Sequence, residues 1–335
     1  MLLADANRSS HEEALFARVK RYQEGTASVN LSAEAILAIS MQEGVDFATT
    51  LLYHYIRQSA KHAPFIRSIE SSDDDFHSSF DPNLRIVIVP GAFYREFPNS
   101  GADGRMLRQA AQELGIPVDV IPLKSFGSLK ENATIIENWL QQNNDRPIVL
   151  VSLSKGASDL RVAFAQQNAP QTFQSVKAWI NLSGITYGSP IVEWLFAYKL
   201  RSLWYWLLLT LQGHDFRVAG QMGCDPKSPL SDDLKIPLHM QVIHVVGFPL
   251  HCHMTSPLAR RMHGRIAPQG PNDGGGIRLA DVLRLPGYVY PVWGADHYLQ
   301  PPGRDMQQLV RAILHFVSKP NPTNQLQPAI TGALS

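Results

Sequence analysis

The sequence predicts an α/β protein with a mainly parallel sheet flanked by helices, a helical N-terminal extension and an apolar helical cap. Short β-branched runs alternate with helical segments from residue 85 onwards, which is typical of βαβ crossovers. The strand-like runs are apolar at nearly every position, as expected of strands buried on both faces. A chain of 335 residues can form one large domain of this kind.

The first 80 residues differ in character from the rest of the chain. Alanine, leucine, glutamate and glutamine recur over 11–22 and 32–61 with no strand-like alternation, and Ser32 has the position of a helix N-cap. The polar, acidic run over 71–82 has the composition of a linker. We therefore expect 1–80 to be a helical extension and linker, with the helices packed on the main domain.

The main domain is predicted over 81–319. Six strands are expected, at 85–90, 118–123, 147–152, 176–182, 238–247 and 288–293. Four helices are expected, at 103–114, 129–142, 155–167 and 305–317. The remaining residues, 320–335, are rich in Pro, Asn, Gln and Thr and are expected to be a disordered tail.

Composition excludes several function classes. The formal net charge is +1 with no long basic run, so no nucleic-acid partner is expected. The two cysteines, Cys224 and Cys252, rule out a disulfide framework and suit a reducing compartment. The first residues lack the pattern of a secretory signal, and the uncharged apolar stretch over 202–211 is too short to span a bilayer. The expected location is cytoplasmic, with peripheral contact to a membrane as an option.

The strongest motif is Ser-Leu-Ser-Lys-Gly at 152–156, between a predicted buried strand and a predicted helix. This is the context in which a nucleophile elbow presents a serine hydroxyl at the carboxyl end of the sheet. Strand and helix nearly touch there, so small residues are needed two before and two after the nucleophile, as Ser152 and Gly156 are. Ser154 is the predicted nucleophile, and a chance Ser/Gly turn is the alternative.

A serine nucleophile on such a turn needs a downstream acid and base, in that order. His297, in Gly-Ala-Asp-His after the last predicted strand, is the predicted base. Asp273 lies in a Pro-Asn-Asp-Gly-Gly turn before that strand and is the predicted acid, although Asn-Asp-Gly is also an ordinary turn sequence. Asp281 is a weaker rival in a helix-like segment, and Asp296 is too close to His297 to orient it.

Backbone N–H groups are expected to stabilise an oxyanion near Ser154. Lys155 begins the following helix, so its N–H points toward the developing negative charge. The second donor is expected in the loop after the first strand, Pro-Gly-Ala-Phe-Tyr at 90–94. Ala92 is favoured there over Phe93.

The motifs at 89–93, 152–156, 271–275 and 294–297 together resemble the α/β-hydrolase superfamily, specifically its lipase-like and esterase-like members. The Ser-Lys-Gly elbow with Asp159 shortly after it is similar to a plant and cyanobacterial hydrolase group. Pro90 replaces the histidine usual in lipases, and Ser152 replaces the first glycine of the elbow. The resemblance covers the central two-thirds of the chain and implies an ester or thioester substrate.

An apolar, aromatic segment begins at residue 187 and holds Trp194, Trp204 and Trp206. It lies where this fold carries a cap, so we expect a cap-like insertion over about 187–235. A cap of this kind suits acyl chains, and 194–211 could touch a lipid surface. A core helix packed on the sheet is the alternative interpretation.

No cofactor and no metal are expected. His251 and His253 flank Cys252, but this spacing is not a structural zinc pattern, and no phosphate-binding glycine loop occurs. The predicted function is cleavage of carboxylic esters, of a small-molecule or lipid substrate, through an acyl-enzyme on Ser154. An acyltransferase with the same triad and a non-catalytic binding protein on the same scaffold stay open, and the sequence leaves the oligomeric state undetermined.

Overall fold

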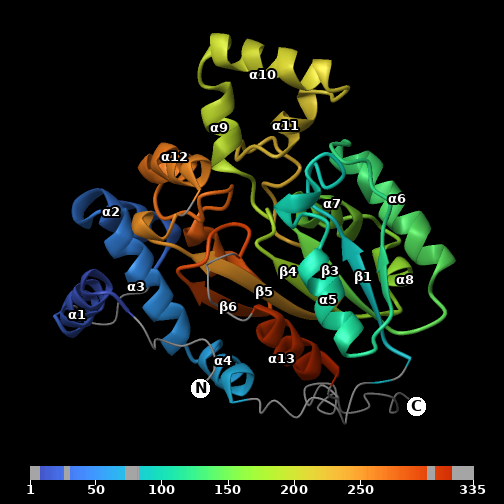
Figure 1. Ribbon diagram of the computed structural model, residues 1–335, viewed down its shortest axis with the longest axis horizontal. Coiled ribbons are helices and arrows are strands. Elements are labelled where there is room, and N and C mark those ends of the chain that lie inside the picture. Colours follow the sequence, from blue (N-terminus) through green and yellow to red (C-terminus); the bar gives the residue numbers. More distant parts are fainter. Residues whose placement is uncertain are drawn as a thin grey trace, which may run out of the picture.

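A computed structural model describes residues 8–25, 31–71, 81, 83–254, 256–299 and 306–318. The expected tail at 320–335 and most of the expected linker at 71–82 lie outside these residues. None of the helices in the described ranges combines the length and apolar character needed to cross a bilayer. The chain's architecture is shown in Figure 1.

Six parallel strands form one sheet in the order β2-β1-β3-β4-β5-β6, which confirms the predicted fold class. The strands are β1 (Arg85–Val89), β2 (Val118–Val120), β3 (Ile148–Leu153), β4 (Val176–Leu182), β5 (Gln241–Phe248) and β6 (Tyr288–Trp293). Parallel neighbours need crossover connections, and helices supply most of them. All carboxyl ends therefore meet at one edge, where Ser154 and His297 follow β3 and β6.

Helices cover both faces of the sheet because successive side chains of each strand point to opposite faces. Ile86 and Ile88 pack in the cluster of α5 (Arg105–Glu113) and α13 (Met306–Ser318). Val87 and Val89 pack in the opposite cluster, with α6 (Leu129–Gln142), α7 (Lys155–Phe164) and α8 (Ala169–Thr172). The strands other than the edge strand β2 are thus mostly buried on both faces, as their continuous apolar runs predicted, whereas all three residues of β2 are half-buried.

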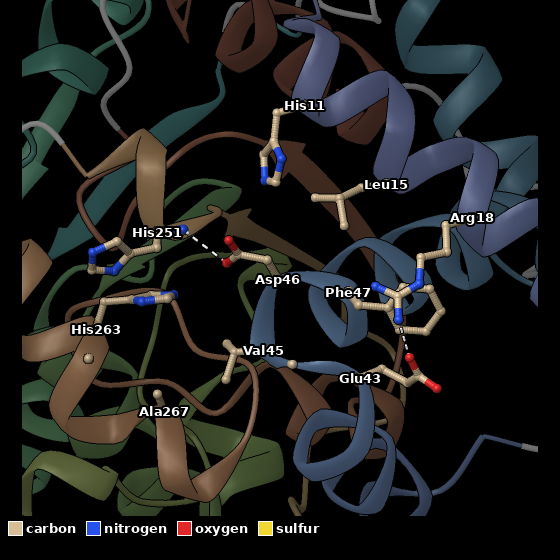
Figure 2. A pocket seen from close by; sticks show the side chains of 12 residues that line it. His11, Leu15, Arg18, Glu43, Val45, Asp46, Phe47, His251, His263 and Ala267 are labelled. Carbon is tan, nitrogen blue, oxygen red and sulfur yellow. Dashed lines mark hydrogen bonds and ion pairs between the residues drawn. The ribbon is translucent and has the colours of Figure 1, made fainter.

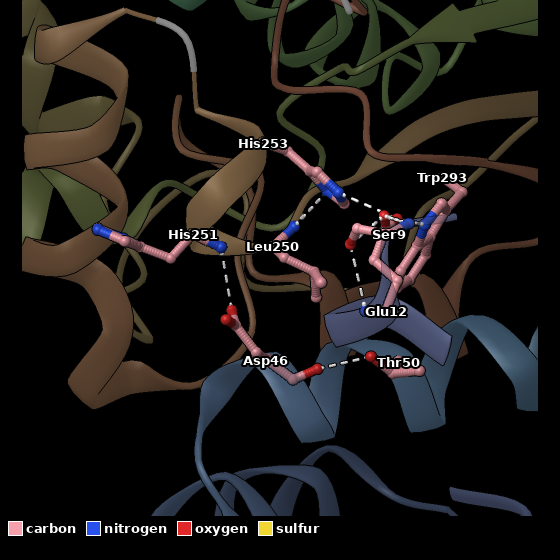
Figure 3. A network of polar contacts seen from close by, with 8 residues as sticks. All are labelled: Ser9, Glu12, Asp46, Thr50, Leu250, His251, His253 and Trp293. Carbon is pink, nitrogen blue, oxygen red and sulfur yellow. Dashed lines mark hydrogen bonds and ion pairs between the residues drawn. The ribbon is translucent and has the colours of Figure 1, made fainter. Parts of the chain in front are cut away.

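The N-terminal extension is helical and packs beside β6. It consists of α1 (Ser10–Glu24), α2 (Ala33–Glu43), α3 (Val45–Gln58) and α4 (Ala63–Glu70). The segment predicted as one helical run breaks at Gly44, whose φ of 94° only glycine adopts readily. Glu12 of α1 accepts hydrogen bonds from Trp293 Nε1 at 2.6 Å and His253 Nε2 at 3.1 Å (Figure 3). The extension is therefore joined to the strand that leads to His297.

Several boundaries differ from the sequence-based expectation, since β2 ends at Val120 and not at 123, and α7 ends at Phe164 and not at 167. β5 begins at Gln241 and not at 238, because Met240 N–H donates to Pro237 O in a turn that leaves Leu238 fully exposed. The segment around Asp281 is a 3-10 helix, Leu279–Arg284, in which Asp281 pairs with Arg278 at 3.1 Å. The late start of β5 and the 3-10 helix around Asp281 both come from local turns, which a pattern of apolar residues does not reveal.

The segment after β4 forms α9 (Pro190–Phe196), α10 (Lys199–Leu211) and α11 (Arg217–Gln221). In Figure 1 α10 stands away from the body of the molecule, at the top. Within α10, which is described throughout, Leu209 is the one buried side chain, whereas Leu200 is 83% exposed and Trp204 61% exposed. α10 is therefore not a core helix packed on the sheet, whereas α9 buries Pro190, Val192 and Leu195.

Candidate active site

Three predicted side chains, far apart in the chain, come together in the structure, with His297 within hydrogen-bonding distance of both Ser154 and Asp273. His297 Nε2 lies 2.9 Å from Ser154 Oγ, and His297 Nδ1 lies 2.6 Å from Asp273 Oδ2. His297 and Asp273 are buried, and Ser154 is half-buried. Ser154 is thus partly accessible, while the two residues behind it are shielded from water.

Ser154 occupies a strained turn between β3 and α7. Its φ of 47° and ψ of −118° lie in a region that non-glycine residues rarely adopt, at a cost on the order of 1–3 kcal/mol. The turn needs a glycine two residues later: a Cβ on Gly156 would lie 2.4 Å from Val89 O. This close approach of helix to neighbouring strand is the geometry that the Ser-Leu-Ser-Lys-Gly motif predicted.

Ser152, which stands where a first glycine is common, is fully buried and has both hydrogen-bonding roles filled. Its Oγ accepts from Trp179 Nε1 at 2.9 Å and donates to Asn181 Oδ1 at 3.0 Å. A hydroxyl at this position is therefore part of a buried polar chain on β3 and β4. The departure from glycine leaves the turn at Ser154 intact.

The acid loop, residues 270–277, encloses the Asp273 carboxylate. Asp273 Oδ1 accepts from the backbone N–H groups of Gly275, Gly276 and Ile277 at 2.9–3.0 Å, which leaves Oδ2 for His297. His297 N–H also donates to Asp273 O at 2.9 Å. A Cβ on Gly275 would lie 2.1 Å from His297 Cβ, so only glycine lets the imidazole lie against this loop.

The electrostatics fix the protonation of this pair. Burial would raise the pKa of Asp273, but His297 and the backbone donors hold that pKa below its ordinary value of 3.8. Burial would likewise lower the pKa of His297, but Asp273 raises it above 6.5. Because an ionised carboxylate only accepts, the neutral imidazole carries its proton on Nδ1 and accepts from the Ser154 hydroxyl at Nε2.

The three predicted oxyanion donors differ in availability. Phe93 N–H donates to Ser125 O at 3.0 Å and Gly91 N–H to Ala102 O at 2.9 Å, while Pro90 has no N–H. Ala92 N–H, between Gly91 and Phe93, has no acceptor in the described part of the chain; the same holds for Tyr94 N–H, two residues farther from Gly91. The loop lies beside the nucleophile, since a Cβ on Gly91 would be 3.4 Å from Ser154 Cβ. Lys155 is the first residue of α7, where helical geometry gives the N–H no acceptor.

An apolar cluster connects the cap to the loops around Ser154. Its buried members from the cap include Val192, Leu195, Leu209 and Phe216, and Ala92, Phe93 and Ile277 lie against or within it. Phe93 stacks on Phe126 with ring centroids 4.6 Å apart. The surface beside the hydroxyl is therefore apolar and partly aromatic.

The other candidate groups have other partners, although the charge of Asp296 contributes to the raised pKa of His297. The Asp296 carboxylate accepts from Tyr298 N–H at 2.9 Å. A cavity of about 400 Å³ lies between α1, the α2–α3 junction and α12 (Pro257–Ile266), lined among others by His11, His251 and His263 (Figure 2). Ser154 does not line it. No group of three or more metal-ligating side chains is found in the described ranges, and Cys224 and Cys252 are free thiols.

Sequence reasoning did not identify two features of the site. One is the contact of Gly275 with His297, which depends on two loops meeting in space. The other is Asn132, whose side chain is buried against Asp159 of the nucleophile helix at 3.0 Å. An asparagine within an otherwise buried helix face was the one available signal, and it did not indicate a partner.

No protein-family model matches the chain, and no curated protein matches it in sequence. Two of the solved structures that are similar to the chain cover most of its length. A metagenomic carboxyl esterase has a TM-score of 0.56 and 16% identity, covering 91% of this chain and 98% of that chain. A mature-form lipase of Bacillus licheniformis has a TM-score of 0.52 and 19% identity, covering 71% and 91%. With the parallel sheet and the turn at Ser154, these likenesses show that the chain has the α/β-hydrolase fold of lipase-like and esterase-like proteins.

Proposed function

We propose that the protein is a serine hydrolase that cleaves carboxylic esters through an acyl-enzyme on Ser154. The observation that carries this proposal is the continuous hydrogen-bonded path from Ser154 Oγ through His297 to Asp273, with distances of 2.9 and 2.6 Å. A nucleophile, a base and an orienting acid are the groups that acyl transfer requires. The esterase and lipase neighbours support the same reaction class.

In the proposed first step, Ser154 Oγ attacks the ester carbonyl carbon and its proton passes to His297 Nε2. The carbonyl oxygen becomes an oxyanion, which the N–H groups of Ala92 and Lys155 stabilise. Asp273 stabilises the imidazolium that forms and stays ionised. The tetrahedral intermediate collapses when the carbon–oxygen bond to the alcohol breaks and His297 returns the proton to the leaving oxygen.

In the second step, water attacks the acyl carbon and gives a proton to His297 Nε2. The bond to Ser154 Oγ then breaks, the serine regains its proton, and the carboxylic acid leaves. An alcohol in place of water would give acyl transfer by the same steps. Product analysis with added short alcohols separates the two: free acid as the main product supports hydrolysis, and a dominant new ester supports the acyltransferase alternative.

The apolar cluster beside Ser154 supports an apolar acyl substrate. Ala92 and Phe93 follow Gly91, which lies against Ser154, and they pack on the cluster that holds Phe126 and Ile277. Apolar surface of this kind contributes about 25 cal/mol for each Å² it removes from water. We therefore expect acyl chains to be preferred over charged acids.

A fluorophosphonate probe tests the proposed nucleophile. The probe should label the wild-type chain, and Ser154→Ala should abolish labelling and ester hydrolysis. Ser158→Ala is a matched control, because the Ser158 hydroxyl donates to Ile185 O at 2.6 Å and not to His297. An unlabelled, inactive wild-type chain would instead favour a non-catalytic binding protein.

Peripheral membrane contact through 194–211 is a second part of the proposal. Leu200, Trp204 and Leu211 are exposed on α10, and α12, which packs against α9, exposes Arg260 and Arg261, which suits an anionic lipid surface. Trp204→Ser should reduce co-sedimentation with phosphatidylglycerol vesicles, and unchanged binding would contradict the contact.

The free thiols suit a reducing compartment, so we propose a cytoplasmic location.

A further inference from the structure

A buried chain of polar contacts connects the helix that begins after Ser154 to the loop that holds Ala92. It starts at Lys155, whose Nζ lies 2.6 Å from Asp159 Oδ1 one turn later in α7. Asp159 Oδ2 accepts from Asn132 Nδ2 of α6 at 3.0 Å. All three side chains are almost completely buried, with 1% of each residue exposed.

Asn132 continues the chain to the segment that precedes α6. Its Oδ1 accepts from Lys124 N–H at 3.1 Å, and its Nδ2 donates to Lys124 O at 3.1 Å. A single amide side chain thus binds both backbone groups of one residue, which fixes that residue's position and orientation. The next residue is Ser125.

Residues 123–125 in turn hold the loop that contains Ala92. Phe93 N–H donates to Ser125 O at 3.0 Å, and Tyr94 OH donates to Leu123 O at 2.8 Å. The Ser125 hydroxyl also donates to Glu96. The loop after β1 is therefore fixed at Phe93 and Tyr94, next to Ala92, whose N–H has no acceptor in the described part of the chain.

A buried ion pair beside a nucleophile is not explained by stability alone. Removing two charges from water costs several kcal/mol per ion, and apolar replacements of similar volume are often as stable or more stable. Burial raises the pKa of Asp159 to about 6 against the opposing effect of Lys155, which reflects this desolvation. This series of polar contacts can fix two separate N–H donors relative to each other. Apolar packing does this less well, because hydrogen bonds define direction.

We propose that Lys155, Asp159 and Asn132 are positioning residues that hold the Lys155 and Ala92 N–H groups at the spacing that an oxyanion requires. This inference rests on the proposed serine hydrolase function. The side chains act on the reaction through the backbone and do not touch the substrate. Their loss should weaken binding of the tetrahedral state more than binding of the ground-state ester.

A pair of ketones separates positioning from general stability. A trifluoromethyl ketone accepts Ser154 Oγ at its carbonyl carbon and becomes a hemiketal oxyanion, while the Ser154 proton passes to His297. The methyl ketone of the same chain length stays a ground-state analogue. Asn132→Ala breaks the link from α7 to Lys124 and keeps the Lys155–Asp159 pair, whereas Lys155→Met removes the first contact.

Both variants should lose at least about tenfold in affinity for the trifluoromethyl ketone and in kcat. Affinity for the methyl ketone and KM should be nearly unchanged. Lys155→Arg, which keeps a cation for Asp159, should recover part of the loss. The control is Glu70→Gln, which breaks the Arg57–Glu70 pair at 2.6 Å, remote from Ser154, and should lower stability without changing the ratio of the two affinities.

The outcomes distinguish this inference from the function on which it rests. An active wild-type chain whose Asn132→Ala variant keeps the wild-type ratio of ketone affinities would overturn the positioning role alone. A wild-type chain that hydrolyses no ester and forms no hemiketal would overturn the proposed function and this inference with it. If Lys155→Met fails to fold, Asn132→Ala and Lys155→Arg still decide the question.

Discussion

The acid loop at 270–277 and helix α10 are built in opposite ways. In the loop, Asp273 is fully buried and one carboxylate oxygen alone accepts three backbone N–H groups. On α10, leucine and tryptophan side chains face outward, and Leu209 alone is buried. The first region holds one carboxylate by directed hydrogen bonds to both of its oxygens, and the second leaves apolar surface unmatched.

The two regions differ because proton transfer and apolar contact place different demands on the structure. Proton transfer between fixed atoms loses rate steeply when an atom moves by 1 Å, so the groups around His297 need several restraints each. A surface that meets acyl chains or lipid needs area and apolar character but no exact register. Substitutions in the loop should therefore change rate greatly, and substitutions on α10 should change substrate preference modestly.

Asp273→Asn should have the largest effect. The asparagine Oδ1 can keep the three backbone N–H groups, so its Nδ2 would face His297 Nδ1 and force the proton to Nε2. That tautomer cannot accept from Ser154, and kcat should fall by about 10⁴-fold. Steady-state kinetics with a short-chain ester measures this loss of kcat. Asp281→Asn, whose carboxylate pairs with Arg278, should stay within a few-fold of wild type.

Gly275→Ala should have the next largest effect. The added methyl would lie 2.1 Å from His297 Cβ and 2.2 Å from Cγ, so the imidazole must move away from Ser154. A displacement of about 1 Å predicts a loss of about 10²-fold in kcat/KM. Gly264→Ala on α12 meets nothing within 4 Å and should be close to wild type. Equal activity of the two variants would contradict the packing of Gly275 under His297.

Local signals in the sequence were sufficient for the sheet and for the turn at Ser154. The buried apolar run, the small residues two before and two after the serine, and the following helix are contiguous. Their pattern can therefore be recognised within one short segment. Asp273 and His297 were found through their order and their positions relative to strands. The structure brings both within reach of Ser154.

Contacts between distant segments could not be read in this way. The Phe93 N–H is not available to an oxyanion, because it donates a hydrogen bond to Ser125 O, 32 residues away. Asn132 meets Asp159 across two helices, and nothing in either local sequence specifies that pairing. The turn at 237–240 that delays β5 depends on one backbone hydrogen bond, which apolar patterning over 238–247 does not reveal.

The pH dependence of kcat/KM tests whether Asp273 of the acid loop raises the pKa of His297. His297 must be neutral to accept the Ser154 proton, and Asp273 raises the pKa of His297 above 6.5 despite burial. Activity should therefore fall as pH decreases through a midpoint above 6.5, and residual activity of Asp273→Asn should show a lower midpoint. Stability has the opposite sign: the raised pKa stabilises the fold below 6.5, and this contribution is lost as pH rises through the folded-state value.

Double substitution of α10, Trp204→Ser with Leu211→Ser, should have the smallest effect and test the other side of the comparison. Both side chains are exposed, at 61% and 77%, so the free energy of unfolding should change by no more than about 0.5 kcal/mol. Hydrolysis of long-chain esters should fall by about tenfold, which corresponds to roughly 1.4 kcal/mol of lost apolar contact. Acetyl esters should be cleaved at the wild-type rate. Equal losses on both substrates would mean that α10 supports the fold of the active site, and that the contrast with the acid loop does not hold.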